Sequence, residues 1–71
     1  IRVNMDTGLF PAWSKFGFNL ENGEAMQAVR RMKASNLIRL VGLHAHIGTF
    51  VLDPLCYRTA AEKLIALASA L

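Results

Sequence analysis

Cysteine, charge and long apolar runs are scarce in this sequence, and each scarcity excludes a class of protein. The one cysteine, Cys56, cannot form an internal disulfide, which excludes the disulfide-bonded frameworks of small secreted domains. No apolar run approaches the roughly 20 residues of a membrane-spanning helix, and the N-terminal residues lack the pattern of a signal peptide. We therefore expect a cytoplasmic protein with no membrane partner.

The balance of charged and apolar residues is unusual for a chain of this length. Charged residues make up 18% of the 71 residues and hydrophobic residues 54%, whereas globular domains carry about 25% charged residues. A chain this short buries only about 60% of the surface of its unfolded state. This composition, with Ile1 rather than methionine in first place, predicts an interior segment of a larger protein.

The basic residues do not form a pattern typical of nucleic-acid binding. The net charge is +3, and only Arg30, Arg31 and Lys33 stand close together. A nucleic-acid site would bring aromatic or further basic residues to the same face. We interpret this group as the solvated face of a helix and expect no nucleic-acid partner.

Two segments have the pattern of β-strands. Residues 1–5 alternate apolar and polar side chains, and residues 37–43 form a near-continuous apolar run. Such a run is typical of a parallel strand that is buried on both faces. A short buried helix is the alternative for 37–43, but the β-branched Ile38 and Val41 favour a strand.

Two further segments have the pattern of α-helices. An amphipathic helix is predicted over 22–35 with Asn22 as its N-cap, and a second helix is predicted from Asp53 and Pro54 to the end of the chain. Cys56 lies in the first turn of this second helix, where we expect a core or interface residue. The order strand, helix, strand, helix implies parallel strands, since each helix makes a crossover. We therefore predict an α/β fold of two consecutive βα units (βαβα) from a larger layer or barrel.

Aromatic residues are concentrated in the loop after the first strand. Phe10, Trp13, Phe16 and Phe18 fall within nine residues. Because this segment is too apolar for a solvent-exposed loop, we predict that it packs down as a lid or a wall of a pocket.

Both histidines of the chain lie in one stretch, GLHAHIGT, at residues 42–49. The first interpretation is structural, a pair of histidines hydrogen-bonded in a buried loop. The second is a metal site, because side chains two apart on a strand point the same way. A complete metal site needs three or more ligands, and only Asp6 and Asp53 would be at hand to join His44 and His46.

A third interpretation of the same stretch is a site for a cofactor phosphate. Gly48 allows the backbone to approach a ligand closely, and Thr49 supplies a hydroxyl donor. Active sites of βα folds lie at the carboxyl ends of the strands, which is where this stretch follows the predicted strand. From these residues alone the three interpretations stay open.

Three segments in order, RVN at 2–4, SKFGF at 14–18 and GLHAHIGT at 42–49, carry a family resemblance. Their succession resembles the fold-type III pyridoxal-phosphate decarboxylases of diaminopimelate, ornithine and arginine. The resemblance implies a (β/α)8 TIM-type barrel that binds pyridoxal 5'-phosphate and is followed by a β domain. Residues 1–71 would be a partial barrel domain of a cytoplasmic, homodimeric enzyme that decarboxylates an amino acid.

The resemblance also implies roles for individual residues. His46 matches a catalytic histidine that stacks on the cofactor ring, and Thr49, after Gly48, matches a hydroxyl residue that contacts the cofactor phosphate. Arg2 matches an arginine near the ring, and Lys15 matches a lysine near the active-site entrance. The other histidine, at position 44, matches no fixed catalytic position and is expected to support the first. No metal is implied.

The same resemblance places essential parts of the enzyme outside this segment. The lysine that forms the Schiff base belongs to a segment upstream of the position that Ile1 matches, so we expect the isolated chain to be inactive. The loop between Asn4 and Ser14 is short, which argues against diaminopimelate as the substrate. Two alternatives are a metal-dependent hydrolase barrel that uses the His-x-His pair and a non-catalytic pyridoxal-phosphate-binding barrel without the β domain.

Overall fold

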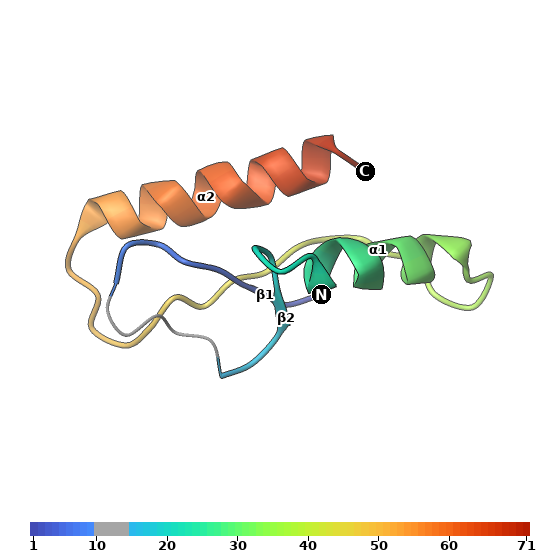
Figure 1. The fold of residues 1–71 in the computed structure, drawn as a ribbon, viewed down its shortest axis with the longest axis horizontal. Coiled ribbons are helices and arrows are strands. Elements are labelled where there is room, and N and C mark those ends of the chain that lie inside the picture. The colour runs from blue at the N-terminus through green and yellow to red at the C-terminus, as the bar shows by residue number, and fades with distance from the viewer. Residues whose placement is uncertain (10–14) are drawn as a thin grey trace.

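The computed structural model describes residues 1–9 and 15–71 as two short strands and two helices (Figure 1). In chain order these elements are β1 (Val3–Asn4), β2 (Phe18–Asn19), α1 (Glu24–Ala34) and α2 (Pro54–Ser69). The fold therefore combines helices with extended segments, as the α/β prediction requires.

The strand β1 lies between two extended neighbours that run parallel to it. On one side it pairs with β2, with Val3 opposite Phe18 and Asn4 opposite Asn19. On its other side Arg2 forms a parallel bridge with His44. The parallel direction of the extended segments is thus confirmed, and β1 is the central one.

The core lies where both helices meet β1. Val3 and Met5 of the first extended segment are buried together with Ala25 of α1 and with Ala60 and Leu67 of α2. Leucine, alanine and isoleucine side chains of the segment around His44 pack against this cluster from its edge. Figure 1 shows α2 running alongside the first residues of the chain.

The predicted strand over residues 37–43 is wrong. No regular strand forms there, and the side chains of Leu37 and Val41 are 94% and 85% exposed. An apolar run is buried as a strand only when neighbours cover both its edges and its faces. Among the described residues the first extended segment is the only one beside it, and it bonds to the end of the run alone, from the Ile1 amine to the Gly42 carbonyl at 2.9 Å and by the bridge to His44.

The strand β2 was not predicted from the sequence, so the observed order departs from βαβα. It is two residues long and follows Gly17, whose backbone has a positive φ of 91°. Periodicity cannot identify an element this short, because alternation is recognised over about four to eight residues. Pairing with β1, rather than a local pattern, makes Phe18 and Asn19 a strand.

The second helix agrees closely with the prediction. Asp53 is its N-cap, with Oδ1 accepting a hydrogen bond of 2.9 Å from the backbone N–H of Leu55, and Pro54 occupies the first turn. Cys56 is buried as expected. Neither helix of the described ranges is long and apolar enough to cross a membrane.

The first helix begins later than predicted. Its N-cap is Gly23, in the left-handed region with φ 88°, and its first residue is Glu24. The expected N-cap, Asn22, stands outside the helix and accepts a hydrogen bond of 3.0 Å on Oδ1 from the Glu24 N–H. Its side chain therefore stabilises a turn before the helix. The predicted buried stripe is confirmed, since Ala25 and Val29 are buried.

Replacement of Asp53 by alanine tests the capping of α2. Asp53→Ala in the full-length protein should lower the free energy of unfolding by about 1 kcal/mol, because the Leu55 N–H loses its acceptor. Denaturant titration measures this change. Glu62→Ala is the matched control on the same helix, because it removes only an exposed ion pair with Arg58 and should cost less than about 0.5 kcal/mol. Equal losses for the two variants would contradict the assignment of the cap.

Candidate functional site

The segment that carries both histidines has one apolar and one polar face. Leu43, Ala45 and Ile47 are half-buried and pack against the core cluster. His44 and His46 alternate with them and are exposed. Because successive side chains of an extended backbone point to opposite sides, the two imidazoles share the face that is turned away from the core. The interpretation as a buried histidine pair is therefore wrong for the described structure.

Arg2 lies beside His44 through backbone pairing. The N–H of Val3 donates to the carbonyl of His44 at 2.7 Å, and the N–H of His44 donates to the carbonyl of Ile1 at 2.9 Å. Directly opposed residues of a sheet project to the same side. Arg2, which is half-buried, and His44, which is exposed, therefore belong to one polar face, although they are 42 positions apart in the chain.

The polar face continues into a turn at Gly48 and Thr49. Gly48 has φ 147°, and a Cβ there would come within 3.2 Å of a Val51 methyl carbon, so a side chain would be strained and crowded. Thr49 is exposed, and Phe50 after it also has a positive φ, 55°. No described contact brings the Thr49 hydroxyl against His46 or Arg2; the chain itself places it three residues after His46.

The donor set on this face fits an anionic, aromatic cofactor. Arg2 carries a fixed positive charge, Thr49 has a hydroxyl donor, and His46 has a planar ring. None of these residues brings a carboxylate that would repel a phosphate. The space beside the Gly48 Cα is taken by side chains of Val51 and Leu9, so the glycine there serves the turn.

Lys15 and Arg2 converge on one aromatic ring. The Lys15 Nζ lies 5.3 Å from the centroid of the Phe16 ring, and the central guanidinium carbon of Arg2 lies 5.2 Å from the same centroid. Both distances are in the range of cation–π attraction. Lys15 is thus brought to the side of the chain where Arg2 lies.

The prediction that the aromatic loop packs down as a lid or wall is wrong for the two described phenylalanines. Phe16 and Phe18 are 52% and 41% exposed. Burial of these rings would need a second apolar surface opposite them, which the described elements do not supply. Phe10, Trp13 and Ser14, which were part of the predicted lid and motif, lie outside the described residues.

Gly17 allows the SKFGF motif to lie directly against β1. A Cβ at Gly17 would be 2.7 Å from the carbonyl oxygen of Arg2, and its φ of 91° is unfavourable for other residues. The next residue, Phe18, donates its N–H to that same oxygen at 3.0 Å. The glycine of this motif is therefore required by close backbone approach.

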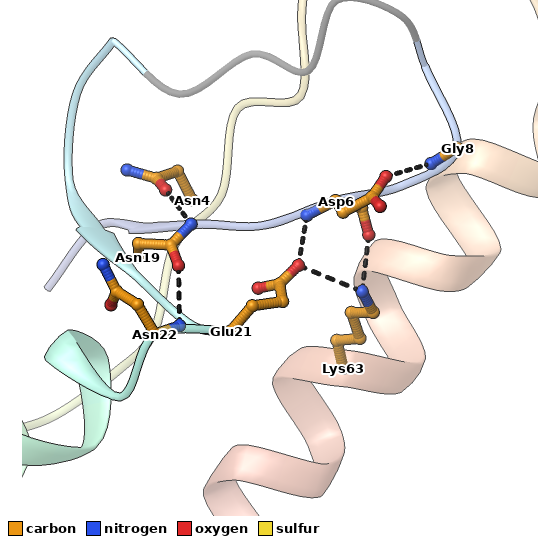
Figure 2. A network of polar contacts seen from close by, with 7 residues as sticks. All are labelled: Asn4, Asp6, Gly8, Asn19, Glu21, Asn22 and Lys63. Carbon is orange, nitrogen blue, oxygen red and sulfur yellow. Dashed lines mark hydrogen bonds and ion pairs between the residues drawn. The ribbon is translucent and has the colours of Figure 1, made fainter.

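Sequence reasoning missed Asn4, a buried polar residue in the middle of β1. Its Nδ2 donates to the carbonyls of Phe16 and Gly17 at 2.9 and 3.0 Å. Its Oδ1 accepts from Asn19 Nδ2 at 2.8 Å (Figure 2). A signal was available, because asparagine is unfavourable in a strand unless its amide has partners. The partners themselves are not recognisable from spacing.

A second polar cluster joins α2 to the carboxyl end of β1. Lys63 donates from Nζ to the carbonyl of Asp6 at 2.6 Å and to Glu21 Oε1 at 3.2 Å, and the same carboxylate accepts the N–H of Asp6 (Figure 2). Lys63 is thus engaged in holding the helix to the strand end.

The metal interpretation of the His-x-His pair finds no third ligand in the described ranges. Across residues 1–9 and 15–71, no group of three or more histidine, cysteine, aspartate or glutamate side chains could hold an ion. Asp6, one of the two additional ligands considered, instead accepts the Gly8 N–H on Oδ1 at 2.9 Å. Asp53 caps α2.

Alanine substitutions at two glycines separate backbone strain from close approach. Gly8 and Gly17 have nearly equal φ angles, 92° and 91°, but a Cβ at Gly8 would meet nothing within 4 Å. Gly8→Ala should cost about 1 kcal/mol of stability through strain alone. Gly17→Ala should cost about 1–3 kcal/mol more, because the methyl group collides with the Arg2 backbone. Denaturant unfolding of both full-length variants measures the difference, and equal losses would contradict the close approach.

Comparison with known proteins identifies the family to which this chain is similar. The family model described as "Pyridoxal-dependent decarboxylase, pyridoxal binding domain" matches residues 1–71. Diaminopimelate decarboxylase of Mycobacterium leprae is 47% identical over 53 residues, which are 75% of this chain and 11% of that protein. Diaminopimelate decarboxylase of Bacillus subtilis is 43% identical over 51 residues, 72% of this chain and 12% of that protein.

The chain therefore spans only 11–12% of the length of these curated relatives. No solved structure matches it significantly. The family match nevertheless covers every residue, and the cofactor that it implies, pyridoxal 5'-phosphate, is one that the polar face fits. The chain belongs to the pyridoxal-binding domain family of the pyridoxal-dependent decarboxylases.

Proposed function

We propose that this chain is part of the (β/α)8 barrel of a pyridoxal-phosphate-dependent amino-acid decarboxylase. The observation that carries the proposal is the family match over residues 1–71. The polar face supports it, because backbone pairing gathers Arg2 and the His44–His46 segment on one side of parallel extended segments. The carboxyl ends of such segments are where barrel enzymes bind their ligands.

The exposed apolar surface supports a larger barrel around this chain. An interior barrel segment should present apolar side chains that neighbouring units of the barrel cover, and large patches of this kind are typical of interfaces. Several large hydrophobic side chains are at least 60% exposed: Leu37, Val41, Phe50, Leu52, Leu55 and Ile65. Neighbouring units of the barrel would cover these side chains.

The chain's own residues would hold the cofactor by three kinds of contact. His46 would pack its imidazole against the ring and restrict its tilt, and Arg2 would place a positive charge near the ring. Thr49 would donate its hydroxyl to the phosphate, and the positive φ of Gly48 would allow the turn that precedes it. When bound, pyridoxal phosphate accepts the electron pair that is left as the substrate loses its carboxylate.

An amino acid is the proposed substrate, with diaminopimelate the first to be tested. The short loop between Asn4 and Ser14 argued against diaminopimelate, but the two relatives described above carry that substrate in their names. Lys15, which lies near Arg2 across the Phe16 ring, would stand at the entrance of the site. We further propose a cytoplasmic homodimer whose essential Schiff-base lysine and β domain come from other segments of the protein.

Spectroscopy of the full-length protein tests the proposed function. The purified protein should show an absorption band of bound pyridoxal phosphate that disappears on borohydride reduction, and it should release carbon dioxide from diaminopimelate or another amino acid. A protein without the band, whose activity is lost on chelation, would instead be a metal-dependent hydrolase. A protein with the band and no release of carbon dioxide from any amino acid would be a non-catalytic cofactor-binding barrel.

The two histidines should differ in their effect on the cofactor. His46→Ala should weaken the affinity of the full-length protein for pyridoxal phosphate by roughly five- to tenfold, since ring stacking is worth up to about 1.5 kcal/mol. His44→Ala keeps the backbone bonds to Ile1 and Val3 and should change the affinity by less than about twofold. Fluorescence titration of the apoprotein measures both. Equal or reversed effects would contradict the assignment of His46.

The hydroxyl of Thr49 should contribute to phosphate binding. Thr49→Val keeps the shape of the side chain but removes the donor, so affinity for pyridoxal phosphate should fall by about ten- to a hundredfold. Thr49→Ser is the matched control and should stay within about threefold of the parent. Pyridoxal without phosphate, titrated against the same variants, should bind Thr49→Val and the parent protein alike. A valine variant with unchanged affinity for the phosphorylated cofactor would refute this contact.

A further inference from the structure

We propose that Asn4 is a positioning residue for Arg2, an inference that rests on the proposed role of Arg2 at the cofactor. The two residues stand two positions apart on the same extended segment, so their side chains share a face. Asn4 is 6% exposed and therefore lies beneath the surface on which a cofactor would bind. Its effect on the cofactor must be transmitted through the residues that it holds.

The amide of Asn4 holds the turn at Phe16 and Gly17 against β1. Two hydrogen bonds from its Nδ2, of 2.9 and 3.0 Å, go to the carbonyl oxygens of these consecutive residues. A third bond, from Asn19 Nδ2 to Asn4 Oδ1 at 2.8 Å, fixes the orientation of the amide. Among the described residues no buried side-chain nitrogen or oxygen is left without a partner. This site is therefore specific for an amide, which has both the donors and the acceptor that these partners require.

The turn that Asn4 holds contacts both the backbone and the side chain of Arg2. The carbonyl oxygen of Arg2 accepts the N–H of Phe18, and the Phe16 ring lies 5.2 Å from its guanidinium carbon. The turn thus limits both the backbone and the side chain of Arg2. Without the Asn4 amide, two carbonyl groups lose their donors and the Phe16 ring loses its support. The guanidinium would then sample more orientations, and its charge would be less well aligned with a bound ring.

The network around Asn19 extends the same support to the start of α1. Asn19 Oδ1 accepts the N–H of Asn22 at 2.9 Å (Figure 2). The Asn19 N–H donates to Glu24 Oε2 at 3.2 Å. Asn22 belongs to this network only through its backbone N–H and its own bond to Glu24. The described hydrogen bond of its side chain goes to Glu24 and not to the turn at Phe16 and Gly17, which makes it a matched asparagine control.

Cofactor affinity and the visible circular dichroism of the bound cofactor test the positioning role in the full-length protein. Asn4→Ala should weaken the affinity for pyridoxal phosphate by about tenfold and alter the dichroism at saturating cofactor, which reports the surroundings of the ring. Asn22→Ala should leave both within about twofold of the parent. The decisive variant is the pair Asn4→Ala with Arg2→Gln. If Asn4 acts through Arg2, the double variant should bind the cofactor as Arg2→Gln alone does.

Each further outcome supports or overturns the proposal. Asn19→Ala, which removes one of the three bonds to the Asn4 amide, should lower affinity by about threefold in the parent and not at all beside Arg2→Gln. This variant decides the question if Asn4→Ala fails to fold as an apoprotein. Losses that add to that of Arg2→Gln, or an unchanged dichroism, would overturn the positioning role while leaving the proposed function intact. A parent protein that binds no pyridoxal phosphate would overturn the proposed function itself.

Discussion

The described structure depends on the backbone of β1, which pairs with an extended segment on each side. The Arg2 carbonyl accepts the N–H of Phe18, and the backbone groups that flank Arg2 bond to His44. These bonds join three parts of the chain that are separated by a loop and by a helix. Because both pairings are parallel, the three segments present their side chains in a common pattern of faces. The core and the polar face both follow from that arrangement.

This central pairing restricts which residue types can occupy the positions around it. The chain approaches β1 so closely at Gly17 that a methyl group would collide with the Arg2 carbonyl. The turn there also leaves two consecutive carbonyl groups near the strand, and a buried carbonyl without a donor is costly. Asn4 meets this need with one side-chain amide. A glycine and an asparagine, neither a good strand former, are thus what makes this strand pairing feasible.

The two faces of the paired segments differ in burial and polarity. One face buries Val3 and Met5 under α2, and the helix is held at the strand end by Lys63. The other face carries Arg2 and both histidines, and it is the only part of the described chain where a fixed cation and imidazoles gather beside a glycine turn. Membership in the pyridoxal-binding family explains why a small segment should bury apolar side chains on one face and expose polar ones on the other. The polar face is the surface on which we propose that the cofactor binds.

Local signals in the sequence were enough to determine the helices, the parallel α/β character and the family. Asp53 and Pro54 define the start of α2 because a cap and its first turn act within four residues, and SKFGF and GLHAHIGT are recognisable as motifs. Only the tertiary structure showed that β2 exists, that 37–43 forms no regular strand, and that Asn4 is bonded to Phe16 and Gly17. These features are contacts between residues 12 to 42 positions apart. The local pattern of side chains does not determine which distant segment of backbone a strand pairs with.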